Sequence, residues 1–317
     1  MKQTLLLSLV LIGCHFSPAQ NYNAVDDIVL GYPDNFNSIK TFSERIQKDF
    51  NTDVDKVRAV YFWISNHIKY DYKSLSRKNK SQTYKDDTEL TLIQRRYAEK
   101  VLKRKLGVCE GYSQLMKFVL NELNIETKVI TGYAKRFPKE IGKIRNSTNH
   151  AWNAVKVDGK WQLIDATWST ATNANDPEHV DFKETYFFIA AKDLLKSHLP
   201  QEEKWQLLDK PMTKSEFFYQ PLFYEPYFNS GLELSEENLG ILRIKTDDFI
   251  RIPFDIVNKD NSYYYAFKND KTTRNLDLEE VEKGHLTQIP FNSNRNDILT
   301  IYHDFNAVLA FKIIVDK

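Results

Sequence analysis

Gly107-Val108-Cys109-Glu110-Gly111-Tyr112 contains Cys109, the most informative residue of this chain. Cys109 is one of two cysteines, and the other, Cys14, lies in an N-terminal apolar segment. If that segment is removed, the mature chain has one thiol and no internal disulfide. A helix is predicted to begin at Cys109, where the helix dipole lowers a thiol pKa and favours the nucleophilic thiolate. The alternative is a small buried apolar side chain, the usual role of a free cysteine.

The N-terminal segment predicts export. One lysine precedes an apolar run from Leu5 to Gly13 that is too short to span a bilayer, and Ser17-Pro18-Ala19 provides small residues for cleavage before Gln20. We therefore expect a signal peptide over residues 1–19 and a periplasmic, secreted or surface-held protein. The alternative is a lipoprotein, because Leu11-Ile12-Gly13-Cys14 resembles a bacterial lipobox in which Cys14 would be lipidated.

The charge pattern argues against a nucleic-acid partner. The chain has 44 Lys and Arg against 43 Asp and Glu, for a net charge of +1, and the two signs are mixed throughout. The short basic run at residues 77–80 is interpreted as a solvated loop. No Cys/His spacing suits a metal, and no Gly-Lys-Ser/Thr follows Gly107 and Gly111 to make a phosphate loop. We expect no metal and no cofactor.

Hydrophobic periodicity predicts an α+β fold. Apolar residues at helical spacing predict helices over residues 53–68, 86–106 and 109–123. The period then changes, and residues 127–134, 151–157 and 161–165 alternate as strands do. Asp158-Gly159 between the last two is a hairpin signal, so these strands are expected to be antiparallel, with the helices packed on the sheet.

The last hundred residues predict a separate β-sandwich-like domain. Short apolar runs at residues 239–244, 249–256, 263–267 and 308–315 are separated by turn residues. The boundary is placed near Asp209-Lys210-Pro211, which gives domains over residues 20–210 and 211–317. Tyr263-Tyr264-Tyr265 is interpreted as an alternation of core and surface, although the sandwich could also bind a protein or glycan.

Two further blocks could complete a cysteine active site. Acyl transfer by a thiol needs a base, a group that orients the base, and donors for the oxyanion. His150 in Asn149-His150-Ala151-Trp152-Asn153 and Asp165 in Asp165-Ala166-Thr167-Trp168 flank the hairpin and are expected to lie on adjacent strands within side-chain reach. Taken singly, they would more often be a structural histidine and a cap or turn residue. Other histidines, including His67, His179 and His198, lack a matching neighbourhood.

These three blocks resemble the transglutaminase-like superfamily of papain-like cysteine enzymes. Further segments are similar to its kyphoscoliosis-peptidase-like branch, and the resemblance extends over roughly residues 40–210. The similar segments are residues 58–64, 68–71, 132–135, 187–189, 197–200 and 205–208.

The resemblance implies a triad of Cys109, His150 and Asp165 that acts on protein or peptide amides through a thioester. It leaves open whether water or an amine resolves that thioester, and therefore whether the protein is a peptidase, an amidase or a transglutaminase. The main-chain N–H of Cys109 and the side chain of Tyr70 are the expected oxyanion donors. The alternative function is a non-catalytic binding or scaffold module. Expected partners are the substrate, the cell envelope, and a protein or glycan held by the C-terminal domain.

Overall fold

The computed structural model describes residues 22–75, 84–173, 176–236 and 239–316. The predicted signal peptide, the alternative lipidation site at Cys14 and the basic run at residues 77–80 lie outside this part of the chain. Within it, none of the helices combines the length and the apolar composition needed to cross a bilayer.

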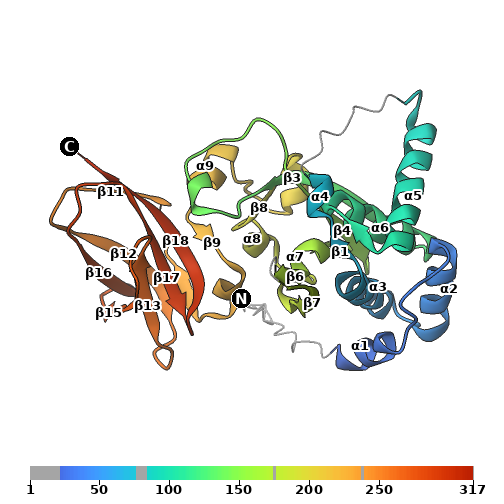
Figure 1. Ribbon diagram of the computed structural model, residues 1–317, viewed down its shortest axis with the longest axis horizontal. Coiled ribbons are helices and arrows are strands. Elements are labelled where there is room, and N and C mark those ends of the chain that lie inside the picture. The colour runs from blue at the N-terminus through green and yellow to red at the C-terminus, as the bar shows by residue number, and fades with distance from the viewer. Residues whose placement is uncertain (1–21, 76–83, 174–175, 237–238, 317) are drawn as a thin grey trace, which may run out of the picture.

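Helices form the first layer of the N-terminal half (Figure 1). Capping side chains set where two of them begin: the Thr52 hydroxyl accepts from the N–H of Asp55 at 3.1 Å, and the Asp86 carboxylate accepts from the N–H of Glu89 at 2.9 Å. The apolar stripes of these helices bury one common core around the central helix α6. The helices are α1 (Asn23–Leu30), α2 (Ile39–Asp49), α3 (Asp53–His67), α4 (Tyr72–Leu75), α5 (Asp87–Arg104) and α6 (Cys109–Glu122).

An antiparallel sheet forms the second layer, in the strand order β5-β4-β3-β8. The predicted hairpin is confirmed: Asp158 and Gly159 turn with φ of 50° and 76°, a backbone region that Asp-Gly turns favour. Contacts of α6 with β3 and β4 place the helix against the sheet, and the side chain of Asn153 on β4 donates to the carbonyl of Ser113 at 3.0 Å. The strands are β3 (Thr127–Ala134), β4 (His150–Val157), β5 (Lys160–Ile164) and β8 (His198–Pro200).

The position of Asp165 differs from the expected one. It was expected on a strand, opposite the strand of His150, but the ladder between β4 and β5 ends at the Asn153–Ile164 pair. Asp165 is instead the N-cap of α7 (Ala166–Ser169), where its Oδ1 accepts from the N–H groups of Thr167 and Trp168. The main-chain N–H of Asp165 donates to the carbonyl of Tyr186 at 3.1 Å and not to β4, and its short acidic side chain satisfies free amides of the new helix.

Short elements complete this half. They are β1 (Lys69–Tyr70), β2 (Leu106–Gly107), η1 (Pro138–Glu140), β6 (Thr170–Asn173), β7 (Asp176–Phe182), η2 (Glu184–Tyr186), α8 (Ala191–Leu194), η3 (Glu203–Gln206) and α9 (Lys214–Tyr219). The parallel pairing of β1 with β2 sets Tyr70 opposite Gly107, two residues before Cys109.

The C-terminal part is rich in β-strands, as predicted. One sheet has the order β10-β12-β16-β15, and the other has the order β11-β18-β17-β13-β14 with β9 also on β18. Tyr263 and Tyr265 are 5% and 6% exposed while Tyr264 is half-buried, which confirms the alternation. The strands are β9 (Leu222–Phe223), β10 (Leu232–Leu234), β11 (Ile241–Ile244), β12 (Asp248–Val257), β13 (Tyr263–Phe267), β14 (Arg274–Asn275), β15 (Glu279–Glu280), β16 (His285–Phe291), β17 (Asp297–His303) and β18 (Asn306–Val315), and η4 (Glu225–Asn229) follows β9.

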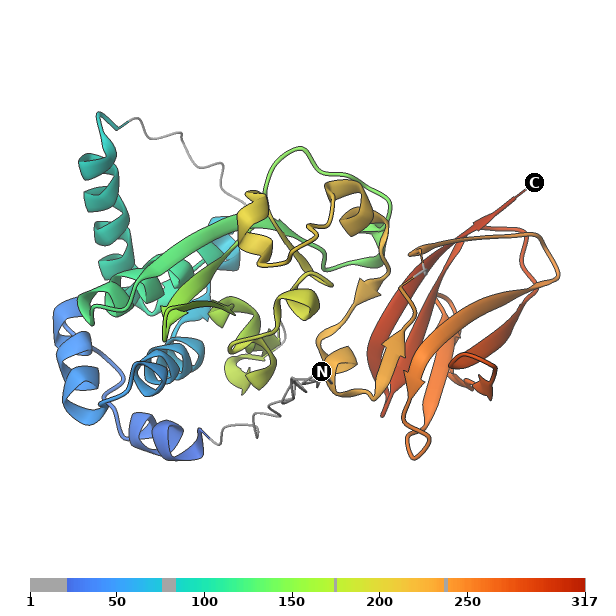
Figure 2. The same ribbon diagram turned by 180° about the vertical axis from the view of Figure 1, so that it is seen from behind.

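The segment between the two parts packs against the N-terminal half. Phe217 and Phe218 of α9 share a buried cluster with Tyr133 of β3. The buried ammonium of Lys135 donates to the carbonyls of Phe217, Gln220 and Pro221 at 2.7, 3.0 and 3.1 Å. Figure 2 shows α9 and β9 between the helical half and the sandwich. The domain boundary near residue 210 stays a prediction.

Candidate active site

Cys109 is the first residue of α6, and the N-cap Val108 makes no side-chain capping bond. The main-chain N–H of Cys109 is therefore outside the helical hydrogen-bond ladder, and the positive end of the helix dipole faces the thiol. Gly111 allows α5 to pack closely against α6. A Cβ at Gly111 would lie 2.9 Å from a methyl carbon of Val101 and 3.0 Å from the Tyr97 hydroxyl, both on α5. The glycine of this block is needed for packing.

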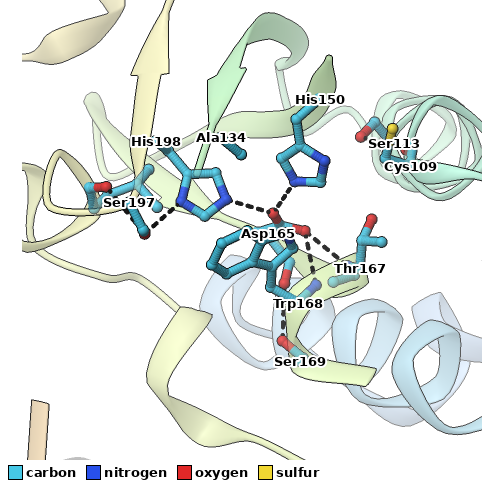
Figure 3. A network of polar contacts seen from close by, with 12 residues as sticks. Cys109, Ser113, Ala134, His150, Asp165, Thr167, Trp168, Ser169, Ser197 and His198 are labelled. Atoms are coloured by element: carbon cyan, nitrogen blue, oxygen red, sulfur yellow. Dashed lines mark hydrogen bonds and ion pairs between the residues drawn. The ribbon is translucent and has the colours of Figure 1, made fainter. Parts of the chain in front are cut away.

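The structure brings His150 between the thiol and Asp165 (Figure 3). Nε2 of His150 lies 2.5 Å from Oδ2 of Asp165, which leaves Nδ1 for the thiol. Burial acts to raise the pKa of Cys109, but hydrogen bonding to His150, the charge of His150 and the N–H of Ala151 outweigh it and lower this pKa. Burial acts to lower the pKa of His150, but the charge of Asp165 and the bonds to Asp165 and Cys109 raise it to about 9. Both shifts favour the thiolate form of Cys109 and the imidazolium form of His150.

Asp165 accepts four hydrogen bonds and is 1% exposed. Oδ1 accepts from the N–H groups of Thr167 and Trp168 at 2.8 and 3.1 Å, and Oδ2 contacts the rings of His150 and His198 at 2.5 and 3.1 Å. Burial would raise the pKa of Asp165, but the charge of His150 and these bonds lower it well below its usual range. The carboxylate is ionised and cannot rotate without losing donors.

His198 contradicts the expectation that it lacks a matching neighbourhood. It begins β8 with no exposed surface, and its Nδ1 lies 2.7 Å from the Ser197 hydroxyl. Gly132 of β3 permits this approach, since a Cβ there would lie 2.2 Å from the carbonyl oxygen of Leu199. Burial is the main cause that lowers the pKa of His198 to about 4, so the ring is neutral at physiological pH. The sequence signal that could have identified His198 is its place in residues 197–200, one of the segments similar to the family.

Tyr70 lies beside the thiol, as the predicted oxyanion role requires. Burial first, and then the negative charge of Cys109, raise the pKa of Tyr70 to about 12, so its hydroxyl stays protonated at neutral pH. Its role as an oxyanion donor stays a prediction.

Among the described residues, one group has donor atoms close enough together to suit a metal ion. Hydrogen bonds within the group explain why these atoms are close. The donor atoms of His150, Asp165 and His198 lie within 4.8 Å of one another. The same atoms are engaged in the two ring contacts to Asp165, and all three residues are buried, which leaves no open coordination position. His67 is structural: its ring stacks on Trp63 and contacts the carbonyl of Trp63 at 2.9 Å. The side chain of His179 lies outside the described residues.

A cavity of about 280 Å³ adjoins this centre. Its walls include Tyr70 from the side of Cys109, Trp168 from the capped turn of Asp165, and Tyr224 and Glu225 from the segment that leads into the sandwich. Trp168 also lies 5.8 Å from His150 between ring centroids. The cavity is therefore close enough to receive a group attached to a carbonyl held at the thiol.

Residues 40–166 match the transglutaminase-like superfamily, and this part of the chain is a transglutaminase-like domain. The chain is 25% identical to the kyphoscoliosis peptidase of Mus musculus over 199 residues, which are 62% of this chain and 28% of that protein. It is 27% identical to hillarin of Drosophila melanogaster over 226 residues, 66% of this chain and 26% of hillarin. It thus spans about a quarter of the length of these curated relatives. A solved structure described as a TGase shares 22% identity over 57% of this chain and 39% of its own, with a TM-score of 0.29.

Proposed function

We propose that this protein is an exported, cysteine-dependent acyl-transfer enzyme that acts on protein or peptide amides. The observation that carries the proposal is the chain of contacts from the half-buried Cys109 through the buried His150 to the buried Asp165, with the thiol pKa lowered and the imidazole pKa raised. A thiol with no catalytic task has no need of this arrangement. The match of residues 40–166 to the transglutaminase-like superfamily supports this class of chemistry.

The reaction begins when the thiolate of Cys109 attacks the amide carbon and forms a C–S bond. The carbonyl electron pair moves to oxygen, and the N–H of Cys109 and the hydroxyl of Tyr70 stabilise the oxyanion. When the C–N bond breaks, the imidazolium of His150 gives its proton to the leaving nitrogen, and a thioester remains. Water or an amine then attacks the thioester while His150 takes the proton, and the thiolate is released with an acid or a new amide.

Asp165 holds His150 in the tautomer that this cycle needs. Because the carboxylate contacts Nε2, the proton stays on that nitrogen and Nδ1 exchanges a proton with the thiol or the leaving group. The ionised carboxylate also stabilises the imidazolium that each step requires.

The test uses the thiol itself. Iodoacetamide should alkylate Cys109 within minutes at pH 7, and a peptide or glutamine-amide substrate should be turned over by the wild type and by a Cys14→Ser control. Cys109→Ala should abolish turnover at an unchanged melting temperature. Turnover that survives in Cys109→Ala would exclude the proposed nucleophile.

A second function is a non-catalytic binding module. The observation in its favour is that Tyr224 and Glu225, which follow strand β9 of the C-terminal part, line the cavity beside the thiol. A surface built only for binding should leave Cys109 with an ordinary thiol, so slow alkylation at pH 7 would favour this function.

A further inference from the structure

Arg136 stands at the edge of the candidate active site. It follows β3, and its guanidinium carbon lies 5.5 Å from the ring centre of Trp168 and 5.9 Å from that of Tyr70. These rings flank the reacting groups, since Trp168 adjoins His150 and Tyr70 adjoins Cys109. The positive charge of Arg136 therefore lies at the cavity, near the two aromatic rings that line it.

The charge of Arg136 is not neutralised within the part of the chain that the structure describes. Its main-chain N–H donates to Glu140 at 2.8 Å, but no described carboxylate forms an ion pair with its guanidinium. The guanidinium hydrogen-bonds to the Tyr70 hydroxyl, which is neutral and leaves the positive charge of Arg136 unbalanced. The other charged side chains of the cavity wall have polar or ionic partners. Lys135 donates to three carbonyls, Lys183 pairs with Asp181 at 2.6 Å, and Glu225 accepts from Thr185.

We propose that this cavity binds an acidic side chain of the acyl donor, an Asp or Glu close to the reactive carbonyl, and that Arg136 pairs with its carboxylate. The proposal rests on the proposed function, because the cavity matters only if a carbonyl is held at Cys109. A volume of about 280 Å³ suits one side chain and not a folded partner. The aromatic walls would pack on its methylene groups, and a guanidinium can bind a carboxylate through two N–H groups at once.

The test uses irreversible peptide vinyl sulfones that carry Glu, Gln, Leu or Lys one or two residues before the electrophile. Each labelling rate is divided by the rate with iodoacetamide, which measures thiol reactivity alone. The wild type should label fastest with a Glu probe, by about tenfold over the Gln probe. Arg136→Gln should remove that preference, while Lys139→Gln, an exposed cation on the same loop, should keep it.

Three results would overturn the proposal: equal rates for Glu and Gln probes in the wild type, a Glu preference that survives Arg136→Gln, or an equal loss for all probes. The last would mean that Arg136 acts on Tyr70 instead of on the substrate. Failure of the proposed function is distinct, since iodoacetamide would then also react slowly with Cys109.

A separate observation concerns His198. Its ring lies in a buried cage, 4.3 Å from Trp168 and 5.3 Å from Trp152 between centroids, and contacts Asp165 on one edge and Ser197 on the other. A neutral imidazole has one N–H, and the ionised carboxylate of Asp165 can only accept a hydrogen bond. The proton of His198 is therefore on Nε2, where it is donated to Oδ2 of Asp165.

We infer that His198 is a positioning residue that holds Oδ2 of Asp165 toward His150. Oδ1 is held by two main-chain amides, so without His198 the carboxylate could tilt about that anchor and lengthen the His150 contact. Arg136, Tyr186 and His150 are the other titratable or charged groups near the ring. This inference rests on the proposed pairing of Cys109 with His150.

The test is the pH profile of Cys109 alkylation for His198→Phe and His198→Gln. Phe removes the donor, whereas Gln can place an N–H near the position of Nε2. We expect His198→Phe to move the acid limb up by about one pH unit, which is about tenfold slower alkylation at any pH on that limb, and His198→Gln to restore most of the rate. His303→Phe, in the sandwich, is the control and should match the wild type.

An unchanged profile in His198→Phe, with a lower melting temperature, would make His198 a packing residue only. A shift of the limb to lower pH would show that His198 weakens the carboxylate instead of placing it. A wild type with no low-pH limb would count against the proposed function and not against this residue alone.

Discussion

Nε2 of His150 lies 2.5 Å from Oδ2 of Asp165 although the strand ladder that leads toward both residues has already ended. The contact is made between the start of one strand and the cap of the helix that follows the other. Asp165 thus both begins α7 and orients the imidazole. Because its other oxygen is held by main-chain amides, the capped turn gives the carboxylate a fixed direction.

Asp165→Asn should separate the two tasks of this residue. An amide still caps α7, so the melting temperature should change little, but it removes the charge on which the imidazolium depends and can invert the tautomer of His150. We expect turnover to fall by about 10²–10⁴-fold, less than in Cys109→Ala. The measurement is kcat with a peptide amide, with Asp158→Asn in the hairpin turn as control. Near-normal turnover would leave Asp165 as a helix cap.

The pH dependence of alkylation should report the coupled pair. The pKa of Cys109 is lowered by His150, so the rate should already be high at pH 7, below the usual range for a thiol. The pKa of His150 is raised to about 9, so the imidazolium should persist until that pH and the rate should change again as it loses its proton. A single step near pH 8.5, as in a free cysteine, would contradict the pairing.

Tyr70→Phe should affect the amide reaction more than the reactivity of the thiol. Removing one oxyanion donor costs about 10²–10³-fold in kcat, whereas alkylation by iodoacetamide forms no oxyanion. Turnover and alkylation are measured on the same sample, and Tyr84→Phe, an exposed tyrosine, is the control. Equal losses in both assays would mean that Tyr70 supports the thiolate and not the oxyanion.

Lys135→Met should destabilise the fold. The ammonium satisfies the carbonyls of Phe217, Gln220 and Pro221, and methionine would leave these buried acceptors without a donor. We expect a loss of about 1–3 kcal/mol in the free energy of unfolding, measured by urea denaturation at pH 7. Lys160→Met, on the exposed end of β5, is the control. Burial lowers the pKa of Lys135 to about 7.

This lowered pKa also sets the sign of a pH effect. Above pH 7 the unfolded chain keeps a proton on Lys135 that the folded chain releases, so this residue makes stability rise with pH between about 7 and 10.5. The slope of unfolding free energy against pH in that window should be smaller in Lys135→Met than in the wild type. An equal slope would show that the buried ammonium keeps its proton.

The sequence was enough to predict the local elements and the three candidate catalytic side chains. Helical spacing located α6 at Cys109, alternation located β3 and β4, and Asp158-Gly159 located the hairpin, because each depends on neighbours within a few residues. The cysteine, histidine and aspartate blocks were recognisable because acyl transfer needs those chemical types. Transglutaminase-like character followed from the same residues.

The tertiary structure decided how those side chains are held. His198 reaches Asp165 because β8 pairs with β3 beside Gly132, a pairing between distant segments that no local period encodes. Asp165 lies outside the strand because its main-chain N–H donates to the carbonyl of Tyr186, while its carboxylate caps α7. Arg136 lies near the rings of Tyr70 and Trp168, which the fold brings together from separate elements. Residue type and spacing identify candidate groups, but the burial and partners that set their charge depend on how distant segments pack.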